Sequence, residues 1–214
     1  MKAQSRTYIE SLYATQATRD RYIAETELKE YVPVVDEDVA RFLRTLLRML
    51  RPARVLEIGT SIGYSTVSMA NGVREYEGRI ETIEFNSAVA AQAQENFARA
   101  GVSDVVTLLL GDAREVVPRV KPGVDFVFLD VDKRLYSELL PHCTRILRPG
   151  GVLVVEDTLF PVINLDAKWH RLIEPIDAFN RLLAAESDLE STILPIGDGV
   201  TIAVKRPQGE EVAA

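Results

Sequence analysis

The stretch Arg54-Val-Leu-Glu-Ile-Gly-Thr-Ser-Ile-Gly-Tyr-Ser65 decides the fold of this chain. Its first part, up to Ile58, is an apolar run typical of a strand buried on both faces. Gly59 and Gly63 then allow backbone conformations and close approaches that a side chain would block. The stretch ends as the start of a helix, where free backbone amides attract an anionic group. It therefore predicts a strand, a tight turn and a helix that together cradle a nucleotide.

Length and composition are those of one globular domain. At 214 residues the chain is large enough for a hydrophobic core and too short for two full domains with a linker. Apolar residues near the N-terminus recur at helical spacing, and a charged piece follows them. We therefore expect one domain over residues 1–214, with a helical appendage over residues 1–32 and a frayed tail over residues 207–214.

The charge and the cysteine content indicate the surroundings of the protein. A formal net charge of −7 is unfavourable for broad contact with a phosphate backbone, so nucleic acid is a disfavoured partner. Cys143 is the single cysteine and cannot form an internal disulfide, which is typical of a reducing compartment. The N-terminus lacks an apolar signal core, and no apolar run is long enough to span a bilayer. We expect a cytoplasmic protein without a membrane partner.

Strand-like and helix-like stretches alternate from residue 54 onward, which predicts a parallel sheet with helices on both faces. Before them, a helix with one apolar stripe begins after Asp36 and ends at Pro52. Two β-rich runs flank Gly197-Asp-Gly199, so the sheet is expected to finish with an antiparallel hairpin. The expected strands cover residues 54–59, 79–84, 105–110, 125–130, 152–156, 191–196 and 200–205, and the expected helices 65–71, 87–100, 136–147 and 173–185.

Acidic residues at the strand ends indicate which nucleotide the turn would bind. Ligands of an open parallel sheet bind at the carboxyl ends of its strands. A dinucleotide site needs G-x-G-x-x-G after the first strand, whereas here the glycines are Gly59 and Gly63 and the strand carries Glu57. Glu84 is placed to accept hydrogen bonds from the ribose hydroxyls, and Asp112 is placed to meet the adenine. Acids instead of basic phosphate ligands suit a phosphate-free nucleoside with a positive centre, such as S-adenosylmethionine.

Six motifs occur in a characteristic order: Val55-Leu-Glu-Ile-Gly-Thr-Ser-Ile-Gly-Tyr-Ser65, Ile83-Glu84, Gly111-Asp-Ala113, Phe128-Leu-Asp-Val-Asp-Lys133, Leu147-Arg-Pro-Gly-Gly151 and Leu194-Pro-Ile-Gly-Asp-Gly-Val-Thr201. Each is weakly specific alone, and the ordered set is strongly specific. Over roughly residues 30–205, the sequence resembles the class I S-adenosylmethionine-dependent O-methyltransferases of the catechol and caffeoyl-coenzyme A type, especially small bacterial members.

The resemblance implies a Rossmann-like α/β fold with a mostly parallel seven-stranded sheet, a C-terminal antiparallel hairpin and helices on both faces. Glu57 and the turn over residues 59–63 would cradle the methionine part of the cofactor, and Ser65 would donate to its carboxylate. Glu84 would hold the ribose, and residues 112–113 would frame the adenine. The cofactor-binding residues implied in this way are Glu57, Gly59, Ser61, Gly63, Ser65, Glu84, Asp112, Ala113 and Asp130.

The resemblance also implies a metal site and a catalytic base. Asp130 and Asp157 match two of the family's three metal ligands, and Lys133 matches its base, so Lys133 and Asp130 are the implied catalytic residues. A divalent cation such as Mg²⁺ takes oxygen ligands and lowers the pKa of the attacked hydroxyl. A buried lysine beside it is expected to have the low pKa that a base needs. Thr158 stands where the family usually has its third ligand, an asparagine, and is the third metal ligand implied here, since a hydroxyl can coordinate Mg²⁺ or water can fill the gap. A metal-free reaction that uses Lys133 alone also stays open.

The expected methyl acceptor is the hydroxyl of a catechol-like or other phenolic small molecule. Members of this family are typically homodimers, and the apolar N-terminal helix offers a surface for that contact. One alternative is a transfer RNA hydroxyuridine O-methyltransferase, which a basic strip beside the pocket would favour. Another is an NAD-type oxidoreductase or a non-catalytic cofactor-binding protein, which the glycine spacing opposes. The arginines that could form the strip are Arg41, Arg44, Arg48, Arg51 and Arg54.

Overall fold

The structure is a computed structural model that describes residues 3–16, 18–31 and 33–207, with the backbone alone for residues 3–6 and 10. The frayed tail expected over residues 207–214 lies outside the described residues, apart from residue 207. No helix within these ranges has the length and apolar character needed to cross a membrane.

Residues 33–207 contain a seven-stranded sheet in the order β3-β2-β1-β4-β5-β7-β6. The five strands from β3 to β5 are parallel, whereas β7 runs antiparallel to both β5 and β6. This confirms the predicted Rossmann-like class I methyltransferase sheet with its C-terminal hairpin. The strands are β1 Arg54–Ile58, β2 Arg79–Glu84, β3 Val106–Leu110, β4 Val124–Leu129, β5 Leu147–Val155, β6 Leu189–Leu194 and β7 Val200–Lys205.

The fifth strand differs from the prediction at its start. It begins at Leu147 and not at residue 152, because Leu147 pairs with Val124 of β4. The register then shifts between Val124 and Phe126, and Gly150 has a φ angle of 73°. The sequence Arg148-Pro-Gly-Gly151 is therefore an irregular part of the strand and not a separate turn before it.

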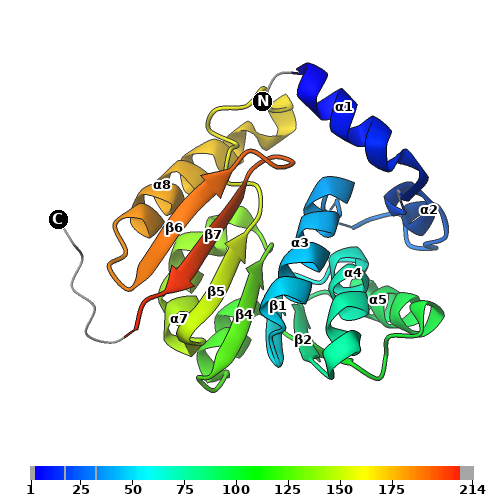
Figure 1. Cartoon of the computed structure of the whole chain (residues 1–214), viewed down its shortest axis with the longest axis horizontal. Coiled ribbons are helices and arrows are strands. Elements are labelled where there is room, and N and C mark those ends of the chain that lie inside the picture. Colours follow the sequence, from blue (N-terminus) through cyan, green and yellow to red (C-terminus); the bar gives the residue numbers. More distant parts are fainter. Residues whose placement is uncertain (1–2, 17, 32, 208–214) are drawn as a thin grey trace.

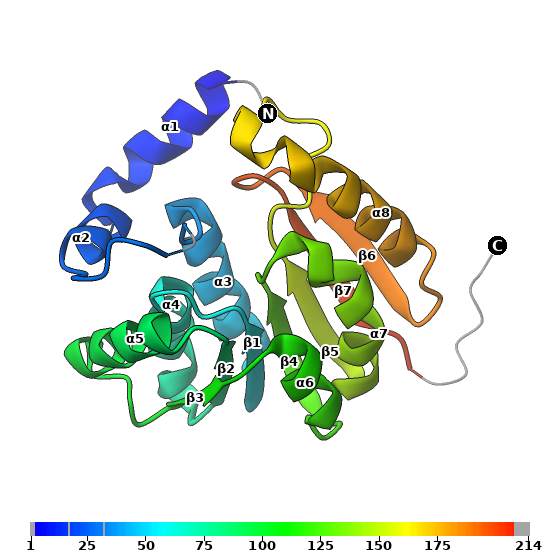
Figure 2. The ribbon, with the colours of Figure 1, turned by 180° about the vertical axis from the view of Figure 1, so that it is seen from behind.

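Helices cover both faces of the sheet, as predicted (Figures 1 and 2). Helices α3, α4 and α5 bury their apolar side chains in one core, where they pack on Phe126, Phe128 and Val154. Helices α6, α7 and α8 form the other core with Leu129 and Val155. Their bounds are α3 Glu37–Leu50, α4 Tyr64–Val73, α5 Ser87–Ala100, α6 Ala113–Val116, α7 Tyr136–Ile146 and α8 Ile173–Ala184, with short 3₁₀ helices η2 Arg74–Tyr76, η3 Val117–Arg119, η4 Lys133–Leu135 and η5 Ala167–Leu172.

The N-terminal segment contains α1 Ala3–Tyr13, the 3₁₀ helix η1 Ala14–Gln16 and α2 Arg19–Ala24. Figure 1 shows that α2 lies beside α5, whereas α1 extends past the end of α3. Arg19 fastens α2 to the chain before α3, since its side chain donates to the carbonyls of Val34 and Val35 at 3.1 Å and 2.9 Å. The segment is therefore tied to the sheet domain through α2.

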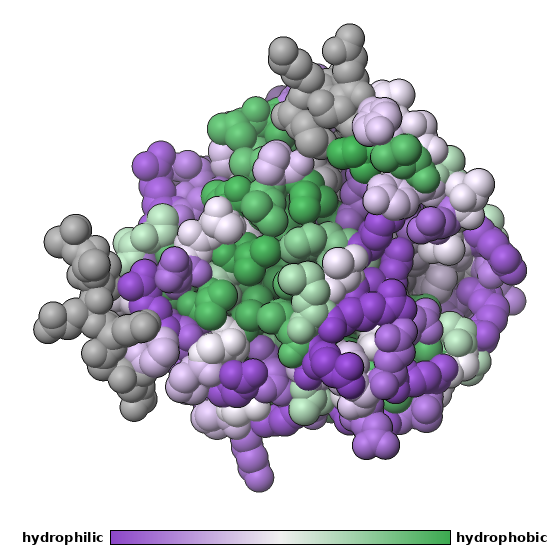
Figure 3. All heavy atoms as spheres, viewed as in Figure 1, coloured by the Kyte–Doolittle hydropathy of each residue, from purple (hydrophilic) through white to green (hydrophobic). Residues whose placement is uncertain are grey.

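A hydrophobic area is exposed on the α3 side of the sheet. Within the described part of the chain, no helix lies over β6 and β7 on this side (Figure 1). Figure 3 shows hydrophobic residues gathered there and along the adjoining part of α3. Met49 of α3 is 74% exposed, and Leu50 and Val204 are also exposed. We call this area, with Met49, Leu50 and Val204, the α3–β7 face.

Candidate active site

The turn after β1 brings two strand ends into close contact. Gly59, Ser61 and Gly63 have positive φ angles of 105°, 48° and 85°. A Cβ atom on Gly59 would lie 2.0 Å from the carbonyl oxygen of Asp130, which follows β4. A Cβ atom on Gly63 would lie 2.4 Å from the ring of Phe97 in α5. Glycine is therefore required at both positions, and Gly59 and Ser61 are only half-buried, which leaves part of the turn open to a ligand.

Glu57 holds this turn from inside the protein. Its fully buried carboxylate accepts hydrogen bonds from the hydroxyls of Ser65 at 2.6 Å, Thr82 at 2.6 Å and Thr66. Burial raises the pKa of Glu57 to about 7, although these three bonds oppose the shift. In this structure the hydroxyl of Ser65 is directed at Glu57, and its expected bond to the cofactor stays a prediction.

Glu84 ends β2 directly beside the turn. One carboxylate oxygen accepts a hydrogen bond from the amide of Ser61 at 3.0 Å, and the other accepts one from the amide of Asn86 at 2.9 Å. Burial raises the pKa of Glu84, and the amide bonds oppose this rise. Each oxygen has a second lone pair, so the oriented carboxylate is able to accept further bonds from a ligand. Phe85, which the sequence analysis missed, follows with a ring that is 71% exposed.

Asp112 lies at the end of the neighbouring strand β3. The amide of Gly111 donates to the carbonyl of Glu84 at 2.8 Å, which holds the two strand ends together. Asp112 caps α6 by accepting from the amide of Arg114 at 2.8 Å, and its carboxylate also pairs with that guanidinium at 2.6 Å. Ala113 is buried behind it. The structure thus brings residues 111–113 next to the strand end that carries Glu84.

Lys133 lies in the middle of an acidic cluster at the ends of β4 and β5. Its Nζ is 2.5 Å from Asp130 Oδ1, 2.9 Å from Asp157 Oδ2 and 3.9 Å from Glu156 Oε2. One carboxylate oxygen of each acid lies within 4.8 Å of the others, so the three could hold a metal ion. The structure therefore brings together the predicted Asp130, Lys133 and Asp157 and adds Glu156.

The charges in this cluster determine its protonation. Burial disfavours the ammonium of Lys133, but Asp130 and the other nearby acids outweigh burial and raise the pKa of Lys133 well above its ordinary value. Burial, together with the charges of Asp157 and Asp130, raises the pKa of Glu156 well above its usual range. In this arrangement the ammonium of Lys133 is itself the counter-charge of the carboxylates, and the low pKa expected for Lys133 beside a cation stays a prediction.

The residues after β5 adopt unusual local structure. Asp157 has a φ angle of 62°, a left-handed conformation that is uncommon for aspartate and often found at functional sites. Thr158 is fully buried, its amide donates to the carbonyl of Gly199 at 3.0 Å, and its carbonyl accepts from Asn180 Nδ2 at 2.7 Å. Among the described residues, no partner is found for the Thr158 hydroxyl. A buried hydroxyl without a partner fits a neutral ligand for a cation.

Each of the five arginines expected to form a basic strip has a neighbour that it contacts. Arg41 and Arg48 pair with Asp38 and Glu75, each at 2.8 Å or less. Arg44 contacts Ser68 and Glu37. Arg51 lies over the ring of Tyr76, and Arg54 pairs with Glu81. The transfer RNA alternative is not favoured, because these groups are occupied by acidic, polar and aromatic neighbours.

Known proteins share this architecture. The family model described as O-methyltransferase matches residues 11–206. The chain is 32% identical over 180 residues to a catechol O-methyltransferase from Niastella koreensis, covering 79% of this chain and 81% of that protein. It is 27% identical over 214 aligned positions to a caffeoyl-CoA O-methyltransferase from Populus kitakamiensis, covering 91% of this chain and 89% of that protein.

Solved structures agree with the sequence comparisons. An O-methyltransferase from Bacillus cereus, in complex with S-adenosylhomocysteine, superposes with a TM-score of 0.74 at 25% identity and covers 94% of this chain and 96% of its own. The O-methyltransferase TomG from Streptomyces achromogenes, in complex with S-adenosylmethionine, superposes with a TM-score of 0.70 at 27% identity, covering 97% of this chain and 100% of its own. The chain therefore belongs to the O-methyltransferase family and is an S-adenosylmethionine-dependent enzyme of the catechol and caffeoyl-CoA type.

Proposed function

We propose that this enzyme methylates a hydroxyl of a catechol-like or other phenolic small molecule. One observation carries the proposal: Lys133 and three carboxylates lie at the same edge of the sheet as the oriented carboxylate of Glu84. The carboxylate of Glu84 suits a phosphate-free nucleoside. The cluster around Lys133 suits an acceptor that loses a proton. The catechol O-methyltransferases among the relatives support a phenolic acceptor.

The cofactor-binding residues have separate tasks in this proposal. S-adenosylmethionine, when bound, supplies a methyl group activated by a sulfonium. Glu84 holds the ribose through its remaining lone pairs, and Asp112 frames the adenine together with the ring of Phe85. Gly59 and Ser61 present backbone to the methionine part, whereas Glu57 keeps the turn in shape.

The acidic cluster holds a divalent cation in this proposal. Asp130, Glu156 and Asp157 would provide charged oxygens, and Thr158 a neutral one, which is the ligand chemistry that Mg²⁺ prefers. A bound cation supplies positive charge that lowers the pKa of the acceptor hydroxyl. Asp130 and the other nearby acids raise the pKa of Lys133, so carboxylates bound to a cation would raise it less, and Lys133 would be the residue placed to take up the hydroxyl proton.

Two measurements test the proposal. Calorimetry should show binding of S-adenosylmethionine and none of NAD, and the variant Glu84→Ala should bind S-adenosylmethionine at least tenfold more weakly, as expected for loss of a charged hydrogen-bond acceptor. Tight binding of NAD alone would overturn the family-based cofactor assignment.

Methyl transfer should then be screened against catechols, flavonoids and hypomodified transfer RNA, with and without a chelator. Product from a phenol that disappears on chelation and returns with added Mg²⁺ is the expected result. Turnover that is indifferent to the chelator would overturn the metal-assisted reaction, and product from transfer RNA alone would overturn the phenolic acceptor.

We further propose that the enzyme is a cytoplasmic homodimer. The exposed α3–β7 face and the exposed apolar side chains Tyr8 and Leu12 on α1 are two surfaces that could meet a second copy. The buried thiol of Cys143, whose pKa burial raises to about 12, is an unreactive free cysteine and fits a reducing compartment.

A further inference from the structure

The carbonyl of Ile62, in the turn after β1, is held by two side chains from elsewhere in the chain. Tyr22 of α2 donates its hydroxyl to this oxygen at 2.9 Å, and Asn96 of α5 donates Nδ2 to it at 2.8 Å. A carbonyl oxygen has two lone pairs, so both acceptor positions of Ile62 are filled. The peptide between Ile62 and Gly63 is thereby fixed in orientation.

This peptide lies at the point where the turn becomes α4. Ser61 before it and Gly63 after it both have positive φ angles, so the backbone here is held in an unusual conformation. The amide of Ser61 is one of the backbone donors that orient Glu84. The amide of Gly63 in this peptide donates to the carbonyl of Thr60 at 2.9 Å, and the Thr60–Ser61 peptide carries the amide that donates to Glu84, so the orientation of the Ile62 peptide is coupled to that of the amide.

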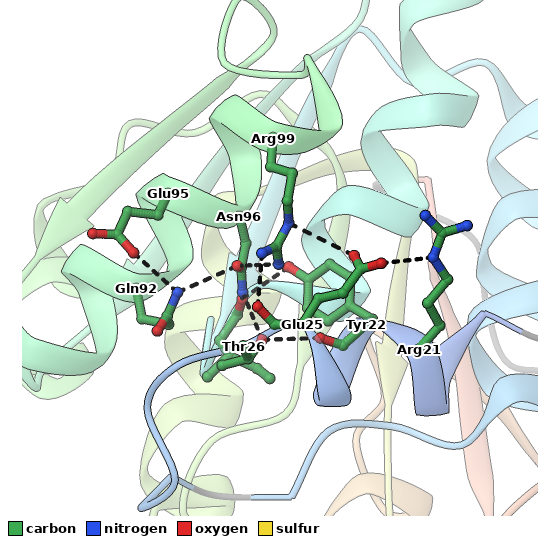
Figure 4. Close-up of polar contacts among 9 residues, drawn as sticks. Arg21, Tyr22, Glu25, Thr26, Gln92, Glu95, Asn96 and Arg99 are labelled. Carbon is green, nitrogen blue, oxygen red and sulfur yellow. Dashed lines mark hydrogen bonds and ion pairs between the residues drawn. The ribbon is translucent and has the colours of Figure 1, made fainter.

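Residues 18–28, which we call the N-terminal clamp, supply Tyr22, one of the two side chains that donate to the Ile62 carbonyl. Figure 4 shows Tyr22, Thr26 and Glu25 facing Asn96 and Arg99 of α5. Asn96 Nδ2 also lies 3.3 Å from the hydroxyl of Thr26, and Arg99 donates to the carbonyl of Glu25 at 2.8 Å. The clamp thus meets α5 through several polar contacts, and Tyr22 extends beyond them to the turn.

Both donors are built into the interior. Asn96 is fully buried, and the ring of Tyr22 packs edge-on against Tyr64, the residue after Gly63, with centroids 5.2 Å apart. Burial raises the pKa of Tyr22, so its hydroxyl keeps the proton that it donates. Tyr64 is held in turn by Glu37, which accepts from its hydroxyl at 2.7 Å and from the amide of Thr18 at 2.8 Å.

We infer that Tyr22 and Asn96 are positioning residues for the cofactor: through the carbonyl of Ile62 they hold the turn in the shape that orients Glu84. The inference rests on the proposed binding of S-adenosylmethionine at this turn. It gives the N-terminal clamp a task in cofactor binding, because Tyr22 acts through its hydrogen bond to the backbone of the turn.

The variant Tyr22→Phe tests the inference, because it removes one oxygen and keeps the ring against Tyr64. We expect its dissociation constant for S-adenosylmethionine to rise about five- to tenfold, as for the loss of one internal hydrogen bond that matters to the bound conformation. The matched control is Tyr76→Phe, since the Tyr76 hydroxyl donates to the carbonyl of Leu47 at 3.3 Å, away from the turn. The control should bind the cofactor as the wild type does.

A double-mutant cycle distinguishes positioning from general stability. Because each single variant keeps one of the two donors to the Ile62 carbonyl and the double variant keeps neither, Tyr22→Phe and Asn96→Ala together should weaken binding by more than the product of their single effects. Thermal unfolding of the cofactor-free variants is measured in parallel. If both single variants and the double variant lose thermal stability but bind S-adenosylmethionine like the wild type, the two residues are merely structural and the inference is wrong. If the wild type itself fails to bind, the proposed function fails first.

Discussion

Lys133 is the residue on which the proposed chemistry depends most. Its ammonium is surrounded by Asp130, Glu156 and Asp157, and only about a tenth of the side chain is exposed. In the variant Lys133→Met we expect turnover to fall by about 10²–10⁴-fold, the usual contribution of a general acid or base. The dissociation constant for S-adenosylmethionine should stay within a factor of about three, because Glu84 and the turn are untouched.

Single-turnover kinetics and calorimetry check this prediction together. The control is Lys168→Met, which removes an exposed lysine paired with Asp166 at 3.7 Å. Full turnover in Lys133→Met would eliminate it as the base. The variant leaves three carboxyl groups without the neighbouring ammonium, which destabilises the fold. Its thermal unfolding is therefore recorded with and without Mg²⁺, to distinguish an unfolded variant from a folded one that has lost turnover.

Glu57 makes a prediction about the pH dependence of stability. Its pKa is about 7 in the folded protein, because of burial, against 4.5 ordinarily. Between these values the folded state binds more protons than the unfolded state, so the free energy of unfolding falls as pH rises from about 4.5 to 7, by roughly 3 kcal/mol from this group. The contribution is fully present below pH 4.5 and is lost above pH 7.

The variant Glu57→Gln has no titrating group and should lose this part of the pH dependence. Urea denaturation between pH 5 and pH 7.5 measures it, with Glu190→Gln, an exposed position on β6, as the matched control. The difference in unfolding free energy between Glu57→Gln and the wild type should change with pH, whereas that of the control should not. Parallel profiles for all three proteins would show that Glu57 titrates alike in the folded and unfolded states.

At the scale of elements, the turn after β1 works only because a helix and a strand end approach it closely. Gly63 and Gly101 both have left-handed φ angles, of 85° and 67°. A Cβ atom on Gly63 would lie 2.4 Å from Phe97, whereas one on Gly101 would meet nothing within 4 Å. We expect Gly101→Ala to cost about 1 kcal/mol of unfolding free energy and Gly63→Ala about 2–5 kcal/mol, because the second adds overpacking to backbone strain.

Chemical denaturation measures this pair directly. Gly63→Ala should also weaken binding of S-adenosylmethionine, since the altered turn carries the amide that orients Glu84. Equal losses of stability in the two variants would mean that the Phe97 ring yields easily and that only the backbone conformation matters.

Elements with local signals at both ends were predictable from the sequence. Helix α5 has its predicted bounds because Asn86 caps its start, accepting from the amides of residues 88 and 89, and Gly101 ends it in a left-handed conformation. The start of β5 was missed because Arg148-Pro-Gly-Gly151 reads locally as a turn, whereas pairing of Leu147 with Val124 across the sheet extends the strand. Tertiary pairing overrode the local signal there.

In the candidate site, too, some features were predictable from the sequence and others were not. Glu84, Asp130 and Asp157 were predictable because parallel topology brings strand ends to one edge. The bond from Ser65 to Glu57 and the place of Glu156 in the cluster were not, because each depends on which way a side chain turns after the strand. Sequence spacing places a residue at an edge without fixing its partner.

At the scale of the whole molecule, the N-terminal segment and the C-terminal hairpin lie on either side of the sheet edge that carries the candidate site (Figures 1 and 2). The C-terminal hairpin contributes directly, since the amides of Thr158 and Leu159 donate to the carbonyls of Gly199 and Asp198 before β7. The α3–β7 face lies away from the turn that would bind the cofactor, so a second copy could cover it without closing that turn.

A homodimer through the α3–β7 face is the last prediction. Light scattering after size exclusion should give about twice the chain mass of 23.8 kDa for the wild type. The double variant Met49→Lys and Val204→Lys places two charges on exposed positions of this face and should yield the monomer mass, because burying an unpaired charge in an interface is unfavourable. The variant Leu12→Lys tests the other candidate surface, since Leu12 on α1 is 53% exposed. If Leu12→Lys gives the monomer and the double variant stays dimeric, the contact lies on the N-terminal helix; a wild type of single chain mass would contradict dimerisation through either surface.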